Sequence, residues 1–180
     1  MTEERIFSHL VRVDALPREG QAVTIEATPA EREELASFYR LPAIAALTAM
    51  LRLDPWGRGG ARVTGAVHGD LTQICVVSLE PFPAIVDEDV DVRFALQTVA
   101  NPRSTAAQET DTFSIADEDE PDPVIDGKID LGALTAEFFA LGLDPYPRKP
   151  GAILDEERTN SEPTDSPFAA LAQRDKDGRE

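Results

Sequence analysis

The feature that most constrains this fold is the alternation of apolar and polar residues. Near residue 90, Val90, Val92, Phe94 and Leu96 occupy one phase of such a run, and charged residues fill the other phase. Successive side chains of a β-strand point to opposite faces of the sheet, so this pattern predicts a strand with one buried face. Composition and spacing predict further strands at residues 7–13, 22–27, 45–54, 61–67 and 71–79. Residues 45–54 are ambiguous, because their Ala, Leu and Met residues favour helix, but their apolar and polar residues alternate and strand is the favoured reading.

The connections between these strands indicate an antiparallel meander. Residues 17–20 read as a turn, so the first two strands are expected to form a hairpin. Residues 54–60 form a predicted loop. Gly69-Asp70 fits either a tight turn or a bulge within one long strand, and the sequence leaves both readings open.

Two helices accompany the strands. Thr28-Pro-Ala-Glu31 has the pattern of a capping box, and the helix it begins should end before Pro42. Asp130 is suited to cap a second helix that ends at Gly142. The predicted buried stripes are Leu35, Phe38 and Tyr39 in the first helix, and Leu131, Leu134, Phe138 and Leu141 in the second. The predicted class is α+β, a meander or partial barrel packed with two main helices in one domain over residues 1–151.

Acidic residues dominate the charge. The 180 residues contain 34 acids and 17 bases, which gives a formal charge of −17. Such a surface opposes broad contact with nucleic acid, because non-specific binding depends on Lys and Arg neutralising phosphates. We expect no DNA partner, and we expect residues 152–180 to form a disordered acidic tail.

The acids are concentrated at residues 101–130, which hold nine acids and two bases. A loop at about 101–128, kept extended by self-repulsion, is the simplest interpretation, and a dock for a basic protein is the alternative. The candidate docking residues are Asp117, Glu118, Asp119, Glu120 and Asp122.

The residues that usually carry catalysis or bind metals are scarce. Cys75 is the only cysteine and the histidines are His9 and His68, so neither a disulfide within the chain nor a zinc tetrad can form. Cys75 lies in an apolar setting and is predicted to be a buried, inert thiol, and His9 is predicted to be a structural histidine on an apolar face. We therefore expect no enzyme activity and no cofactor. The N-terminus lacks an apolar stretch and no run is long enough to span a membrane, so we expect a cytoplasmic protein without a membrane partner.

One basic and aromatic cluster stands out from the acidic background. Trp56 is flanked in sequence by Arg52, Arg58 and Arg62. An aromatic ring among arginines can stack a base, so Trp56, Arg58 and Arg62 are candidate RNA or partner contacts. The alternative is an ordinary hairpin loop with solvated arginines.

Several motifs together resemble the YceD-like family, the large ribosomal RNA subunit accumulation proteins. Its central signature is matched by Val63-Thr-Gly65-Ala-Val67 followed by Leu71-Thr-Gln73-Ile-Cys75-Val-Val-Ser-Leu79-Glu80-Pro81. Three more pieces follow the family's order: Ala27-Thr-Pro-Ala-Glu31-Arg32, then Ile129-Asp-Leu131 through Asp144-Pro-Tyr146-Pro-Arg148-Lys149-Pro-Gly151, and finally Ser166-Pro-Phe168-Ala-Ala-Leu171. Many members have Cys-x-x-Cys-Leu, whereas this chain has Ser78 at the second position and no later cysteine. The resemblance therefore implies no metal site here.

The resemblance implies a non-enzymatic role in accumulation of 23S ribosomal RNA, in bacteria and plastids. The expected partner is the large-subunit precursor, through a basic ribosomal protein, local 23S rRNA or both. Gly65, Gln73, Cys75, Leu79 and Glu80 belong to the signature without an assigned role, and Tyr146, Arg148 and Lys149 are further candidate contacts. The alternative is a small-molecule binding module or enzyme with a pocket between the sheet and the helices.

Overall fold

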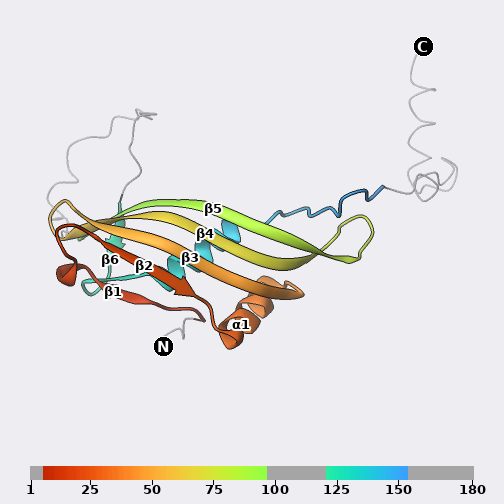
Figure 1. The fold of residues 1–180 in the computed structure, drawn as a ribbon, viewed down its shortest axis with the longest axis horizontal. Coiled ribbons are helices and arrows are strands. Elements are labelled where there is room, and N and C mark those ends of the chain that lie inside the picture. The colour runs from red at the N-terminus through yellow and green to blue at the C-terminus, as the bar shows by residue number, and fades with distance from the viewer. Residues whose placement is uncertain (1–5, 97–120, 154–180) are drawn as a thin grey trace, which may run out of the picture.

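The computed structural model describes residues 6–96 and 121–153. Its main element is a five-stranded sheet in the order β2-β3-β4-β5-β6 (Figure 1). Three long strands form its centre, and two short strands form its edges. Their bounds are β2 Gln21–Glu26, β3 Ala43–Trp56, β4 Gly60–Ile74, β5 Pro81–Leu96 and β6 Asp122–Val124.

Strands β2 to β5 pair antiparallel in chain order, and β6 lies parallel to β5. The sheet is open, with β2 and β6 at its edges. Together with two helices, this arrangement confirms the predicted α+β class and its antiparallel meander. The favoured strand over residues 45–54 is confirmed as part of β3.

The predicted hairpin between the first two strands is wrong. β1 (Leu10–Arg12) pairs with β7 (Lys128–Asp130) in a separate two-stranded sheet, and β2 pairs with β3. A 3-10 helix, η1 (Val13–Ala15), follows β1 and directs the chain away from it. The carboxylate of Asp130 accepts hydrogen bonds from the Ser8 hydroxyl at 2.8 Å and the His9 backbone N–H at 2.9 Å. These bonds help to hold the β1 end beside the start of the second helix.

Strand β4 runs without interruption through Gly69 and Asp70. Gly69 lies opposite Leu47 of β3 and Val86 of β5, so the tight turn is excluded and the strand is continuous. A Cβ atom on Gly69 would lie 2.6 Å from Cε2 of Phe139. Glycine at this position of β4 therefore leaves room for the Phe139 ring of the second helix. The strand predicted over residues 71–79 ends at Ile74, where the chain turns toward β5.

Helix α1 (Pro29–Tyr39) begins as predicted. The Thr28 hydroxyl accepts from the Glu31 N–H at 3.3 Å, and the Glu31 carboxylate accepts from the Thr28 N–H at 2.8 Å, which completes the capping box. The predicted stripe is wrong at Phe38, whose side chain is 67% exposed, whereas Leu35 and Ala36 are buried. Because α1 covers only the end of the sheet near β3, it buries a narrower face than the sequence predicts.

Helix α2 (Leu131–Leu141) begins at Asp130, whose carboxylate accepts from the N–H groups of the first turn, as predicted. Leu131 and Leu134 are buried, but Leu141 is 70% exposed and Phe139 is fully buried where Phe138 was expected. Leu131, Thr135 and Phe139 follow a spacing of four residues, and this row faces the core.

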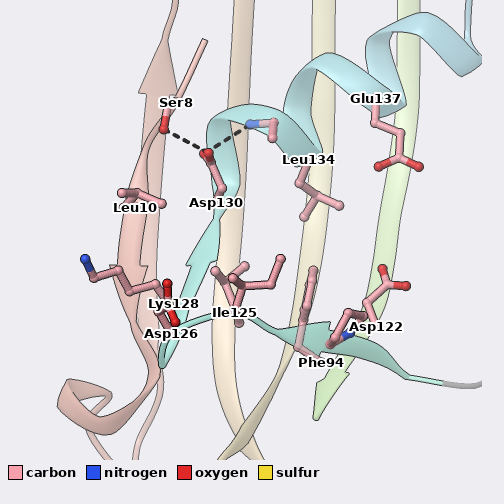
Figure 2. A pocket seen from close by; sticks show the side chains of 13 residues that line it. Ser8, Leu10, Phe94, Asp122, Ile125, Asp126, Lys128, Asp130, Leu134 and Glu137 are labelled. Atoms are coloured by element: carbon pink, nitrogen blue, oxygen red, sulfur yellow. Dashed lines mark hydrogen bonds between the residues drawn. The ribbon is translucent and has the colours of Figure 1, made fainter. Parts of the chain in front are cut away.

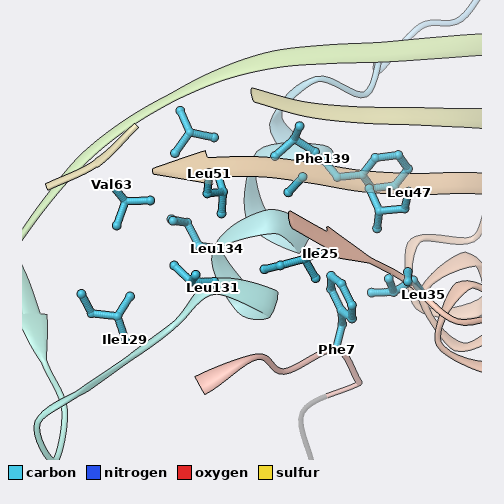
Figure 3. Packing of buried hydrophobic residues seen from close by; sticks show 14 of the residues in the cluster. Phe7, Ile25, Leu35, Leu47, Leu51, Val63, Ile129, Leu131, Leu134 and Phe139 are labelled. Atoms are coloured by element: carbon cyan, nitrogen blue, oxygen red, sulfur yellow. The ribbon is translucent and has the colours of Figure 1, made fainter. Parts of the chain in front are cut away.

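The core lies between one face of the sheet and helix α2 (Figure 3). Leu47, Leu51 and Val63 project from the sheet toward Leu131, Leu134 and Phe139 of the helix. The Tyr39 hydroxyl donates to the Ala136 carbonyl at 2.8 Å and links the two helices. Both described ranges contribute to this one apolar cluster.

Candidate functional site

The family-signature residues meet the later basic motif at one end of the sheet. Residues 75–80 form the turn between β4 and β5, and residues 144–149 lie against it after α2. The Val76 N–H donates to the Pro147 carbonyl at 2.9 Å, and Gln73 Nε2 donates to the Asp144 carbonyl at 3.2 Å. We call this paired unit, residues 75–80 with 144–149, the clasp. It joins two of the candidate sets that the sequence treats separately.

Backbone bonds also close the turn on itself. The Cys75 N–H donates to the Glu80 carbonyl, and the Leu79 N–H donates to the Cys75 carbonyl, both at 2.9 Å. Leu79 has a φ of 60°, a left-handed conformation that is uncommon for a side chain of its size. Such a strained residue persists only where the surrounding bonds fix it, and positions of this kind cluster at functional sites.

Cys75 lies inside the clasp with no exposed surface, which confirms its predicted burial. Its sulfur accepts from the N–H groups of Val77 and Ser78, each at 3.4 Å. The Ser78 hydroxyl, followed by the backbone N–H groups of Ser78, Lys149 and Val77, lowers the pKa of the thiol to about 6, against the opposing effect of burial. These donors favour the thiolate, so the structure adds an acidic thiol where the sequence predicts an inert one.

An ion pair spans the outside of the clasp. Lys149 Nζ lies 2.9 Å from Glu80 Oε2, and both side chains are about half exposed, at 46% and 59%. The hydrogen bond from Lys149 lowers the pKa of the Glu80 carboxyl, and the same bond raises the pKa of the lysine. Lys149 is therefore committed to holding the clasp, whereas Arg148 is exposed and has no ion pair within the described residues.

Several apolar side chains of the clasp, and that of Ile74 just before it, are exposed. Leu79 and Tyr146 are 75% and 71% exposed, and Ile74 and Val76 are also exposed. The sequence predicts Leu79 and Tyr146 as candidates but misses Ile74 and Val76, since an apolar run beside a strand is normally read as core. The prolines at 145, 147 and 150 were the sequence signal for this exposure. They prevent residues 144–150 from forming a regular strand that would cover Ile74 and Val76.

Gly65 has a structural role within the signature. Its φ is 149°, and a Cβ atom there would lie 2.1 Å from the Met50 carbonyl oxygen on β3. Any side chain would therefore collide with the main chain of the neighbouring strand. Gly65 lies within β4 and shapes the sheet, and it is not part of the clasp.

The arginines beside Trp56 are largely engaged with carboxylates. Arg62 binds Asp91 through two hydrogen bonds, at 2.7 and 2.6 Å, and Arg52 pairs with Asp54 at 2.9 Å. Arg93, which the sequence did not single out, lies 6.0 Å from the centre of the Trp56 ring. Arg58 is exposed in the β3–β4 turn. This cluster therefore offers less uncompensated positive charge than its sequence indicates.

Among the predicted docking acids, Asp122 is exposed on β6. Asp117, Glu118, Asp119 and Glu120 lie outside the described residues, as do residues 101–120 of the predicted acidic loop and 154–180 of the predicted tail. The rest of that loop, residues 121–128, is described and contains strand β6 and the first residue of β7.

The prediction that His9 lies on an apolar face is wrong, because its side chain is exposed. Regular strand pairing begins only at Leu10, so the alternation does not extend to His9, whose backbone binds Asp130 and Leu131. His68 lies on β4, with Nδ1 2.6 Å from Asp87 Oδ1. Within residues 6–96 and 121–153, no three His, Cys, Asp or Glu side chains are grouped to hold a metal ion. None of the helices described there is long and apolar enough to cross a membrane.

The described residues define an α+β protein in which an antiparallel meander carries a surface clasp at one end. The family described as large ribosomal RNA subunit accumulation protein YceD matches residues 63–173, more than half of the 180 residues. The chain belongs to the YceD family, as its motifs predict. The matched range contains the clasp and excludes the earlier piece Ala27–Arg32. Comparisons with curated proteins and with solved structures give no match.

Proposed function

We propose that this protein acts in the cytoplasm as a non-enzymatic assembly factor for the large ribosomal subunit, needed for normal accumulation of 23S rRNA. The family's description connects its members with large-subunit ribosomal RNA. The clasp is the observation that supports this role for the chain, because it fixes signature residues and exposes apolar side chains beside Arg148. Rigid, exposed groups of this kind suit recognition of a macromolecule.

The contact is with a basic ribosomal protein, with a local part of 23S rRNA, or with both. At −17, the chain opposes a broad grip on phosphates, and the pairs Arg62–Asp91 and Arg52–Asp54 remove two arginines from such use. Tyr146 and Arg148 remain as a small local contact for RNA. A basic protein would instead be attracted by the overall charge and guided onto the clasp.

The setting of Cys75 supports a role without catalysis. Its sulfur is covered, and its bonding partners in the described part of the chain are backbone N–H groups and the Ser78 hydroxyl, with neither histidine among them. A nucleophilic thiol needs access to substrate and normally a nearby base. We interpret the acidic thiol as a hydrogen-bonded support of the clasp.

Depletion followed by rescue tests this function. We expect depletion to lower the ratio of large-subunit to small-subunit rRNA and to raise large-subunit precursors, and the wild-type chain to restore both. A Leu79→Ser/Tyr146→Ser variant should fold normally and fail to restore them, because both side chains are largely exposed. A matched control is Phe38→Ser, which removes an exposed aromatic side chain from helix α1 and should rescue fully. An unchanged rRNA ratio after depletion would remove this function.

A pulldown separates the two contacts. Recovery of a basic ribosomal protein after nuclease treatment supports the protein contact. Recovery of rRNA that survives removal of ribosomal proteins, with no basic protein, would exclude it and leave the local RNA contact.

A further inference from the structure

A groove of about 600 Å³ lies at the end of the sheet opposite the clasp (Figure 2). The clasp follows the last residue of β4, whereas the groove lies beside Phe94 near the last residue of β5. Its walls come from α2, from β6 and β7, and from β1. We call this feature the end groove.

The end groove has an apolar floor that is only partly covered. Phe94 and Leu134 are buried at its base, but Leu10 and Ile125 are 56% and 59% exposed. Figure 2 shows Leu10 and Ile125 on the same side of helix α2, facing the open space. Two large aliphatic side chains beside a groove provide apolar area that a bound partner can cover.

Acidic side chains surround this floor. Asp122 and Glu137 lie on one side of the groove and Asp126 on the other, where Lys128 is the one basic residue of the lining (Figure 2). Asp122, Asp126 and Glu137 are exposed. Asp130 also lines the groove, but its carboxylate is bonded to Ser8, His9 and the first turn of α2. The available rim charge is negative, which repels RNA phosphates and anionic lipid surfaces.

The net charge of the chain's two longer undescribed segments argues against them as the occupant. Residues 97–120 carry six acids and one base, and residues 154–180 carry eight acids and four bases. A second copy would bring another −17. Each of these would place like charge against the rim, so the complementary occupant is a positively charged segment of another protein.

We propose that the end groove binds a basic amphipathic segment of a partner protein. Its apolar side covers Leu10 and Ile125, and its Lys or Arg side chains face Asp122, Asp126 and Glu137. This inference rests on the proposed function in one respect: the partner would be a basic protein of the large subunit. The end groove would then be a second contact, separate from the clasp.

The test uses a short labelled peptide with leucine along one side and lysine along the other, and measures fluorescence anisotropy with the full chain. The rim variant is Asp122→Asn/Asp126→Asn/Glu137→Gln, in which Asn tolerates the left-handed backbone at residue 126. The charge-matched control is Glu19→Gln/Glu34→Gln/Asp89→Asn, three exposed acids elsewhere. The floor variant is Leu10→Ser/Ile125→Ser. Thermal melts establish that all variants are folded.

We expect the rim and floor variants each to weaken peptide binding about tenfold, the size expected from losing three exposed ion pairs or two apolar contacts, and the control to change it less than about twofold. If the rim variant and the control weaken peptide binding equally, the peptide is held by the general charge of the chain, and the groove proposal is overturned. Unchanged binding by the floor variant would also overturn it, as would an RNA oligonucleotide binding the groove more tightly than the peptide.

Rescue of depleted cells separates this inference from the proposed function. We expect the rim variant to restore the rRNA ratio only in part. If the rim variant rescues fully while Leu79→Ser/Tyr146→Ser fails, the groove proposal is wrong and the proposed function stands. If depletion leaves rRNA unchanged, the proposed function falls and the peptide measurement still decides whether the groove binds a basic segment.

Discussion

Lys149 Nζ lies 2.9 Å from Glu80 Oε2, although 69 positions of sequence separate the two residues. This pair connects the turn after β4 to the segment after α2, and it is reinforced by the main-chain bond from Val76 to Pro147. Two motifs that appear independent in the sequence thereby become one surface.

A charge exchange tests this connection. Glu80→Lys or Lys149→Glu alone places like charges together, so each should loosen the clasp and reduce rescue of rRNA accumulation. Glu80→Lys/Lys149→Glu restores attraction and should recover most of the rescue. Because the pair is exposed, we expect only small changes in melting temperature. A double variant that rescues no better than the worse single variant would contradict the pairing.

Cys75 should titrate as an unusually acidic thiol. Thiolate absorbance of the folded protein should rise with a midpoint near pH 6, and Ser78→Ala should move this midpoint upward because the Ser78 hydroxyl is the largest cause of the shift. A midpoint in the ordinary range of about 8.5 in the folded wild type would contradict the hydrogen bonding of the sulfur.

The same shift predicts how stability depends on pH. The folded thiol has a lower pKa than the unfolded thiol, so its contribution is fully present above the unfolded pKa of about 8.5 and is lost as the pH falls through about 6. The free energy of unfolding, measured by denaturant for wild type and Cys75→Ser between about pH 6 and pH 8.5, should rise with pH more steeply in wild type, because the variant lacks the thiol's contribution. Parallel pH profiles would contradict it.

Gly69 should resist substitution because it contacts Phe139. Gly69→Ala places a Cβ atom 2.6 Å from the fully buried ring, and we expect it to lower the free energy of unfolding by about 1–3 kcal/mol. Phe139→Leu should relieve part of this loss in the double variant. Urea unfolding of the four proteins measures the coupling, and strictly additive losses would contradict the contact.

Asp130 should support two elements at once. Asp130→Ala removes the cap of α2 and should cost about 1–2 kcal/mol, whereas Asp130→Asn keeps an accepting oxygen and should cost less. Hydrogen exchange should also quicken at the His9 N–H, which donates a hydrogen bond of 2.9 Å to the Asp130 carboxylate. Unchanged exchange at His9 in Asp130→Ala would contradict the link to β1.

The sequence predicted those parts of the fold that depend on local chemistry. The capping box at Thr28, the cap at Asp130 and the strand over residues 45–54 follow from neighbouring residues, and each is confirmed. The pairing of β1 with β7 depends on residues about 120 positions away, and a turn at residues 17–20 offered a closer partner. Local patterns carry no information about such distant contacts.

Helix faces and the candidate site show the same limit. Phe38 and Leu141 fit a helical stripe in sequence, but both lie near the C-terminal ends of their helices, and no described residue buries their side chains. The sequence supplied Glu80 and Lys149 as separate candidates, and only the fold brings them within bonding distance. The sequence predicts Asp122 as a docking acid, but it does not predict the end groove itself, because the lining comes from five separate elements.

The most direct test of the central claim measures the ratio of large-subunit to small-subunit rRNA in depleted cells that express clasp variants. Wild type and Phe38→Ser should restore the normal ratio, and Leu79→Ser/Tyr146→Ser should leave it low at equal protein level. Full rescue by Leu79→Ser/Tyr146→Ser would contradict a functional clasp, and a normal ratio in the depleted cells themselves would contradict the role in large-subunit assembly.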